Sequence, residues 1–191
     1  ALRQAVAGAE EIYHLAAMIS VPESVAKPAK CAELNTEGTR RVLAAALAAG
    51  ARKVVLASSA AIYGDNPTVP KLESMPPEPK SPYAETKLAG EHLLEEYRQA
   101  HGLGTTSLRF FNVFGPRQDP RSAYAAAVPI FIAKALRDEP IGIHGDGGQT
   151  RDYVYVGDVA RANLLAMAST ASGEALNISG GKPLSVKFLA E

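Results

Sequence analysis

Apolar and polar residues follow one another in the first 111 positions in a pattern that predicts alternating helices and buried strands. Short apolar runs at 12–17, 53–57 and 105–111 are typical of parallel strands that are covered on both faces. Helical composition or spacing marks residues 1–9, 32–49 and 83–101, and Gly50 and Gly102 stand where helices end. This alternation predicts an α/β fold, a Rossmann-like doubly wound parallel sheet with helices on both faces.

The rest of the chain has a looser pattern. Six prolines at 67, 70, 76, 77, 79 and 82 predict a surface loop, and helices are expected at 123–137 and 159–168 around a turn-rich segment at 145–148. We expect residues 1–115 to form a partial Rossmann cofactor-binding and catalytic domain. Residues 116–191 are expected to form mostly a smaller substrate-binding lobe, partly interleaved with the Rossmann sheet.

Composition narrows the function classes. Twenty Lys and Arg balance 20 Asp and Glu, so no basic field favours nucleic acid or an anionic membrane. No apolar run reaches the roughly 18 residues of a membrane span, and we expect a soluble chain. The single Cys31 favours a reducing, cytoplasmic setting. The four histidines have no metal-ligand spacing, so no metal site is predicted, and His14 is expected to be a packed core histidine.

Two short segments carry candidate chemistry. Tyr83 and Lys87 stand four residues apart at a predicted helix start, so that both side chains project from one face. A nearby ammonium stabilises phenolate and lowers a tyrosine pKa toward the range of a general base. Ser58 and Ser59 follow the strand at 53–57, where they either hydrogen-bond a reacting oxygen or only end the strand as turn formers.

The order and spacing of several motifs resemble the extended short-chain dehydrogenase/reductase family, and within it the NAD-dependent epimerases and dehydratases of nucleotide sugars. The motifs are IYHLAA at 12–17, NTEGT at 35–39, SSAAIYG at 58–64, YAETK at 83–87, RFFNVFGPR at 109–117 and GDGGQTRDYVYV at 145–156. The resemblance implies NAD as cofactor and a sugar nucleotide as substrate.

The same resemblance implies roles for single residues. Ser59, Tyr83 and Lys87 would be catalytic, with Ser59 and Tyr83 also touching the sugar. The cofactor would be lined by Leu15, Ala16, Ala17, Asn35, Ser58, Tyr83, Lys87 and Phe111. Asn112 and Arg151 would hold the sugar nucleotide, Arg151 at its diphosphate, because a guanidinium fork suits phosphate. The alternatives are a strand-end cap for Asn112 and an ion pair with Asp152 for Arg151.

The neighbours of Ser59 indicate which reaction to expect. Dehydrating and decarboxylating members of the family usually carry an acid one or two residues after this serine, whereas Ala60 and Ala61 stand here. We therefore expect 4-epimerisation by transient oxidation and re-reduction. The segment 109–129 resembles most the epimerases of UDP-N-acetylhexosamines or their uronic acids. The small residues Ser122, Ala123, Ala125, Ala126 and Ala127 either leave room for the sugar or only begin a helix. A reductase or dehydratase of the same fold is the alternative.

Two further expectations concern what surrounds this segment. The glycine-rich GxxGxxG turn and the acidic ribose-binding residue of the family are absent, so we expect a fragment that lacks its N-terminal part, or else a non-catalytic remnant. Members of the family usually pair through helices beside the active site. Here those helices are at 34–47 and 87–97, which predicts a homodimer held by a four-helix bundle.

Overall fold

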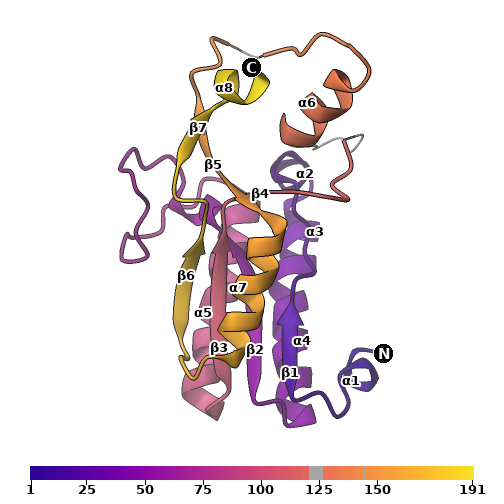
Figure 1. The fold of residues 1–191 in the computed structure, drawn as a ribbon. Coiled ribbons are helices and arrows are strands. Elements are labelled where there is room, and N and C mark those ends of the chain that lie inside the picture. Colours follow the sequence, from indigo (N-terminus) through magenta and orange to yellow (C-terminus); the bar gives the residue numbers. More distant parts are fainter. Residues whose placement is uncertain (121–126, 144) are drawn as a thin grey trace. The chain divides into compact units, whose positions relative to one another are not determined.

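The computed structural model describes residues 1–120, 127–143 and 145–191, which form two compact units (Figure 1). The first unit combines residues 1–110 with 162–177, and the second combines 111–161 with 178–191. Each unit is therefore made from two separate stretches of the sequence. Of the small residues expected near the sugar, only Ala127 falls within the described residues; Ser122, Ala123, Ala125 and Ala126 lie outside them.

A four-stranded sheet forms the centre of the first unit. Its order is β1 (Glu11–His14), β2 (Lys53–Ser59), β3 (Gly104–Phe110) and β6 (Glu174–Ile178). β1 pairs with β2 and β2 with β3 in parallel, and Ser58 lies beside Arg109 in the second pair. The prediction of an α/β fold with a parallel central sheet is confirmed.

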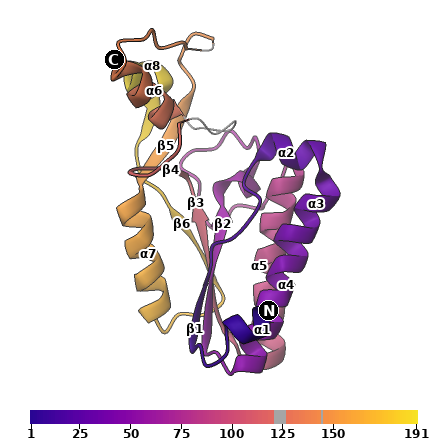
Figure 2. The same ribbon diagram turned by 90° about the vertical axis from the view of Figure 1, so that its right-hand side faces the viewer.

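Helices cover this sheet on both faces. The helices of this unit before β3 are α1 (Leu2–Ala5), α2 (Val21–Ala26), α3 (Pro28–Ala32), the π-helix η1 (Glu33–Glu37), α4 (Gly38–Ala49), the 3₁₀ helix η2 (Ala60–Tyr63) and α5 (Pro82–His101). Figure 2 shows α4 and α5 on one face and the later turns of α7 (Val156–Ala168) on the other. The side chains of α4 and α5 fill the core against the sheet; its buried members are Leu43, Ala46, Ala51, Val54, Leu56, Leu93, Leu94 and Leu103.

Capping residues set both ends of the long helix α5. The Ser81 hydroxyl accepts a hydrogen bond from the Ala84 amide at 3.2 Å, and Pro82 opens the first turn, where its missing N–H costs nothing. Gly102 ends the helix at a φ of 69°. The helix predicted over 83–101 is thus confirmed, and it places Tyr83 in the first turn.

Some boundaries differ from the predictions. The predicted strand at 12–17 ends at His14, because the amide and carbonyl of Met18 bond the Asn35 side chain at 2.7 and 3.0 Å and take the chain away from β2. The predicted helix at 1–9 is only α1, and β2 continues to Ser59. The predicted helix at 32–49 is interrupted, since η1 precedes α4.

In its described residues, the second unit contains a small sheet, two short helices and the first turns of α7. Its strands are β4 (Asn112–Phe114), β5 (Thr150–Tyr155) and β7 (Pro183–Ser185), with β4 parallel and β7 antiparallel to β5. Its helices are α6 (Ala127–Ala135) and α8 (Val186–Ala190). The predicted helix at 123–137 is α6 where the structure describes it, and the one at 159–168 begins earlier, as α7. Within the described residues, no helix has both the length and the apolar character to cross a membrane.

Candidate active site

Ser59 ends β2 and begins the next turn. Its backbone is extended, at φ −150° and ψ 144°, and its hydroxyl accepts a hydrogen bond from the Ala61 amide at 3.1 Å, which caps η2. The sequence alternative of a turn-forming serine is therefore part of what Ser59 does. The same hydroxyl is near enough to the Tyr83 phenol to lower its pKa. Capping and contact with Tyr83 are thus compatible.

Lys87 lies one turn after Tyr83 and is buried, with 6% of its surface exposed. Its ammonium donates to the Ala57 carbonyl of β2 at 2.7 Å and lies 5.8 Å from the centre of the Tyr83 ring. The end of β2 and the first turns of α5 therefore bring Ser59, Tyr83 and Lys87 together, a hydroxyl, a phenol and an ammonium in one place.

The charges of this group are set mainly by burial. Burial raises the pKa of Tyr83 above its usual 10, while the hydrogen bond with Ser59 acts in the opposite direction. Burial lowers the pKa of Lys87 to about 8. The Tyr83 pKa is therefore raised, not lowered as the Tyr–Lys spacing predicted, because a buried phenolate loses its hydration.

The Asn35 side chain joins the segment after β1 to α5, the helix that carries Tyr83 and Lys87, through hydrogen bonds. Besides its two bonds to Met18, its amide donates to the Thr86 hydroxyl of α5 at 3.0 Å. It lies in the π-helix η1, a form that often marks functional sites, and is 3% exposed. The polar atoms of Asn35 thus have protein partners, and what they hold in place is the segment after β1 against α5.

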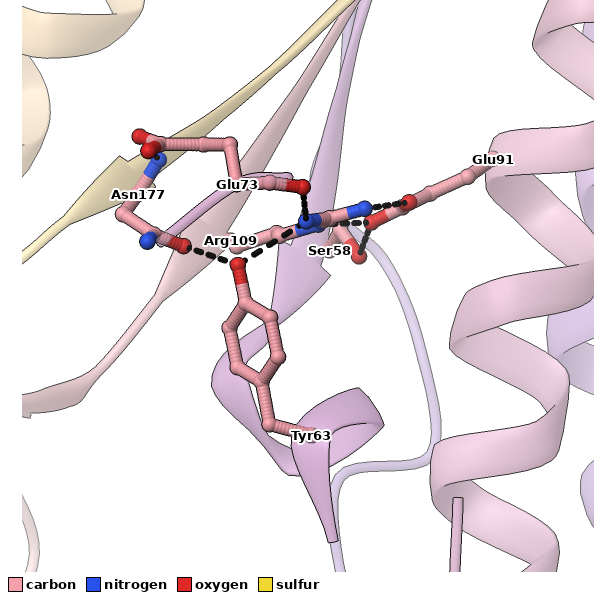
Figure 3. A network of polar contacts seen from close by, with 6 residues as sticks. All are labelled: Ser58, Tyr63, Glu73, Glu91, Arg109 and Asn177. Carbon is pink, nitrogen blue, oxygen red and sulfur yellow. Dashed lines mark hydrogen bonds and ion pairs between the residues drawn. The ribbon is translucent and has the colours of Figure 1, made fainter. Parts of the chain in front are cut away.

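Ser58 points into a buried polar network that the sequence analysis did not identify (Figure 3). The Ser58 hydroxyl donates to the Glu91 carboxylate, which also receives two bonds from the Arg109 guanidinium, at 3.0 and 2.8 Å. Both charged side chains are nearly enclosed, at 9% and 7% exposure. Glu91 stands four residues after Lys87 and eight after Tyr83, a spacing on one helix face that would have pointed to it.

The segment after β1, expected to line the cofactor, borders an open groove. Leu15 and Ala16 are exposed and Ala17 is partly exposed. Ala16 and Ala17 line a groove of about 520 Å³ together with Leu34, Gly38 and Val42. An exposed apolar strand end beside a groove suits a flat, partly apolar ligand.

The remaining predicted residues belong to the second unit. The Phe111 amide donates to the Ile178 carbonyl at 3.1 Å, and the Asn112 side chain donates to the Asp152 carbonyl at 2.9 Å. Arg151 is exposed and bonds the carbonyl of Thr150, whereas the Asp152 carboxylate accepts from the amides of Gly180 and Gly181. This unit also contains an apolar groove of about 530 Å³, lined by Phe114, Pro129, Ile132 and Tyr155 among others.

His14 is packed in the first unit, at 8% exposure, with its Nε2 atom 2.9 Å from the Thr39 hydroxyl. Among the described residues, no group of three or more His, Cys, Asp or Glu side chains is placed to hold a metal ion.

The amino-acid sequence of the chain is similar to that of known proteins. A sequence model described as the NAD dependent epimerase/dehydratase family matches residues 1–179. The UDP-glucose 4-epimerase of Mycolicibacterium smegmatis is 44% identical over 181 residues, which are 94% of this chain and 58% of that protein.

Solved structures resemble the chain over nearly its whole length. A UDP-N-acetylglucosamine 4-epimerase from Methanobrevibacter ruminantium, in complex with UDP-N-acetylmuramic acid, has a TM-score of 0.96 at 39% identity and is matched over 61% of its length, with 99% of this chain covered. The UDP-glucose 4-epimerase of Thermotoga maritima with UDP-glucose has a TM-score of 0.94 at 41% identity, with 99% of this chain and 62% of that one covered. A dTDP-glucose 4,6-dehydratase is similar at 32% identity. The chain thus spans about three fifths of the length of the proteins it matches.

Proposed function

Since the chain belongs to the NAD dependent epimerase/dehydratase family, we propose that it carries the catalytic group of a nucleotide-sugar 4-epimerase, acting on a UDP-hexose or UDP-N-acetylhexosamine. The observation that carries this proposal is the meeting of Ser59, Tyr83 and Lys87 at the end of β2. The cofactor of the family is NAD.

In the proposed reaction each of the three side chains has one task. The Tyr83 side chain, as phenolate, accepts the proton of the sugar 4-hydroxyl and, as phenol, later returns it. The Ser59 hydroxyl, which lies near the phenol, bonds the reacting oxygen and relays this proton to Tyr83. Lys87, held by the Ala57 carbonyl, places a positive charge near the ring and favours phenolate whenever it is protonated.

The residues of the first unit fit a nicotinamide cofactor. The segment after β1 is apolar, with Leu15 exposed and with Ala16 and Ala17 lining an open groove, and the Lys87 ammonium offers a donor for a ribose hydroxyl. NAD, when bound, supplies the hydride chemistry of the family. Asn35 and Ser58 would act by fixing the walls of this site, because their polar atoms are bonded within the protein.

Epimerisation is favoured over dehydration by the residues that follow Ser59. Ala60 and Ala61 form the first turn of η2 and carry only methyl groups. Elimination of water needs an additional acid or base beside the reacting carbons, and methyl groups cannot provide one.

Asn112 and Arg151 of the second unit are our candidates for holding the sugar nucleotide, together with Phe111 beside the nicotinamide.

The first experiment measures NAD binding by calorimetry on this chain and on a version preceded by a Gly-rich phosphate-binding turn. Both are then incubated with NAD and either UDP-glucose or UDP-N-acetylglucosamine, and the products are separated by chromatography. We expect the 4-epimer, with no net NADH formed. A dehydrated product would assign the chain to a dehydratase, and no NAD binding by either form would overturn the proposal.

Substitutions test the catalytic group itself. Tyr83→Phe and Ser59→Ala are each expected to lower kcat by roughly 10²- to 10⁴-fold, the usual contribution of a positioned acid–base group. Tyr13→Phe is the matched control, because Tyr13 is an exposed residue of β1. Full activity of Tyr83→Phe would show that another group is the base.

We also propose that two copies pair through the helices η1, α4 and α5. Leu34 and Leu47, on the first two of these, are 46% and 39% exposed, which leaves apolar surface for a partner. Sedimentation equilibrium should give a dimer mass for the chain and a monomer mass for Leu47→Glu. A wild-type monomer at high micromolar concentration would contradict the pairing.

A further inference from the structure

We propose that Glu91 is a positioning residue for the reaction: with Arg109 and Ser58, it fixes the end of β2 so that Ser59 meets Tyr83. This inference rests on the proposed function, since it concerns the same serine and tyrosine. The buried ion pair of Glu91 with Arg109 thereby becomes part of the site, and its role is to position Ser59.

The first argument is the spacing of contacts along α5. Tyr83, Lys87 and Glu91 follow one another at intervals of four, so they lie on one face of the helix. Two of them bond consecutive residues of β2, Lys87 the Ala57 carbonyl and Glu91 the Ser58 hydroxyl, and Tyr83 lies near the next residue, Ser59, which acts on its pKa. The helix is therefore tied to the strand end at every residue that adjoins the reaction.

The second argument is that the bonding capacity of the ion pair is almost fully used. The Arg109 guanidinium donates through Nε and Nη2 to the two carboxylate oxygens of Glu91, and through Nη1 to the Tyr63 hydroxyl at 2.9 Å and to the Glu73 carbonyl at 3.3 Å (Figure 3). The Tyr63 hydroxyl in turn donates to the Asn177 side chain at 2.8 Å. A guanidinium that bonds both oxygens of one carboxylate does so in a single planar geometry. Neither Arg109 nor Glu91 can therefore turn without breaking several hydrogen bonds.

The third argument is energetic. A buried ion pair gains little net stability over apolar residues of the same volume, because both charges lose their hydration. What this pair supplies is a fixed position for the Ser58 hydroxyl. Because Ser59 is the next residue of β2, holding Ser58 in place also fixes the backbone from which the Ser59 side chain reaches Tyr83.

The test separates positioning from plain stability. Ser58→Ala removes the hydrogen bond between Ser58 and Glu91 but keeps the ion pair of Glu91 with Arg109. Glu91→Gln removes the negative charge that orients both Ser58 and Arg109. Tyr63→Phe is the control, because it deletes two buried hydrogen bonds of the same network without touching Ser58. The readout is the titration of Tyr83, followed by NMR of ring-labelled tyrosine and assigned with Tyr83→Phe.

We expect the Tyr83 pKa to rise further in Ser58→Ala and Glu91→Gln, because the bond from Ser59 that holds it down is weakened, and to stay unchanged in Tyr63→Phe. Cys31 on α3, which raises the Tyr83 pKa, and Lys87 on α5, whose ammonium lies 5.8 Å from the centre of the ring, are not altered. In the epimerase assay kcat should fall roughly 10- to 100-fold in the first two variants, at nearly constant KM, as small misplacements of reacting groups do.

Two results would overturn the positioning role. One is a wild-type titration and kcat in Ser58→Ala, which decides the question even where Glu91→Gln does not fold. The other is an equal shift in Tyr63→Phe, which would mean general loosening. Failure of the proposed function would give a different result. If Tyr83→Phe keeps full activity, Tyr83 is not the base, whatever is measured for Ser58→Ala.

Discussion

The buried histidine of β1 has a defined protonation state. The Thr39 hydroxyl donates its only proton to the Asn35 carbonyl at 2.6 Å, so it must accept from His14, whose hydrogen therefore resides on Nε2. Burial, and to a lesser extent the charge of Lys87, lower the pKa of His14 from 6.5 to about 4. The neutral ring is thus part of the packing of the site, in agreement with the core histidine expected from the sequence.

This histidine makes stability depend on pH. Between about pH 4 and 6.5 the unfolded chain binds a proton that the folded chain does not, so the free energy of unfolding rises with pH across that window. We expect His14→Gln to flatten this rise, measured as urea midpoints from pH 4.5 to 7. His92→Gln, at an exposed histidine of α5, should keep the wild-type slope. An unchanged slope in His14→Gln would show that the pKa of His14 is not lowered in the folded chain.

Single residues were predictable from the sequence where the signal is local. Tyr83 and Lys87 are one helical turn apart, so their proximity follows from helix geometry alone. Glu91 and Arg109 meet only because α5 packs on β2 and β3 in one register, which no short spacing records. The direction of the Tyr83 pKa also depends on burial, and burial is a property of the packed site.

At the scale of elements, Gly64 decides how the proline-rich loop leaves η2. Its φ of 55° and ψ of −135° are open to glycine only, and a methyl group there would overlap the Glu78 carbonyl of the returning loop. The Glu78 amide in turn donates to Ile62 at 2.8 Å, which closes the loop on the end of η2. The turn after the catalytic strand therefore requires a residue without a side chain.

We expect Gly64→Ala to lower the free energy of unfolding by at least about 2 kcal/mol, from backbone strain and overlap together. Gly102→Ala is the matched control, since Gly102 has a φ of 69° but open space around it, and should cost about 1 kcal/mol. Denaturant unfolding of the two variants measures both. Equal losses would mean that the loop moves freely to accept the methyl group.

Long periodic elements were predicted well, and short ones were not. α5 and β2 have many residues with the same preference, whereas α2 and α3 are brief turns that begin at or beside prolines. β4 and β7 are strands of three residues, whose pairing with β5 is settled by neighbours far along the chain. The end of β1 was misplaced because Asn35 draws Met18 out of line with the strand.

At the scale of the whole molecule, Lys53 joins the two stretches that form the first unit. Its ammonium, on a side chain that is 5% exposed, donates to the carbonyls of Ala166, Ser169 and Ala171 at 2.6, 2.7 and 2.8 Å. These carbonyls lie at and just beyond the end of α7, where the helix itself leaves such groups without partners. One lysine at the start of β2 therefore caps a helix that comes more than a hundred residues later.

Replacing Lys53 with Met should lower the free energy of unfolding by about 3 kcal/mol, because one buried and two partly buried hydrogen bonds from a charged donor are lost. Lys27→Met is the control, since the ion pair of Lys27 with Glu23 is exposed and should contribute less than about 1 kcal/mol. Thermal or urea unfolding checks both. A loss in Lys53→Met no larger than in the control would show that water replaces the ammonium at no cost.

The split composition of the first unit also has a consequence for synthesis on the ribosome. β3 is complete at Phe110, but its neighbour β6 is translated only after the whole of 111–161. Until then the nascent chain presents β3 as an open strand edge, the kind of surface that pairs with other chains. The pairing of β6 with β3 therefore comes late in translation. If translation pauses before Glu174, the edge of β3 stays open for longer, and this is when the nascent chain most needs a chaperone.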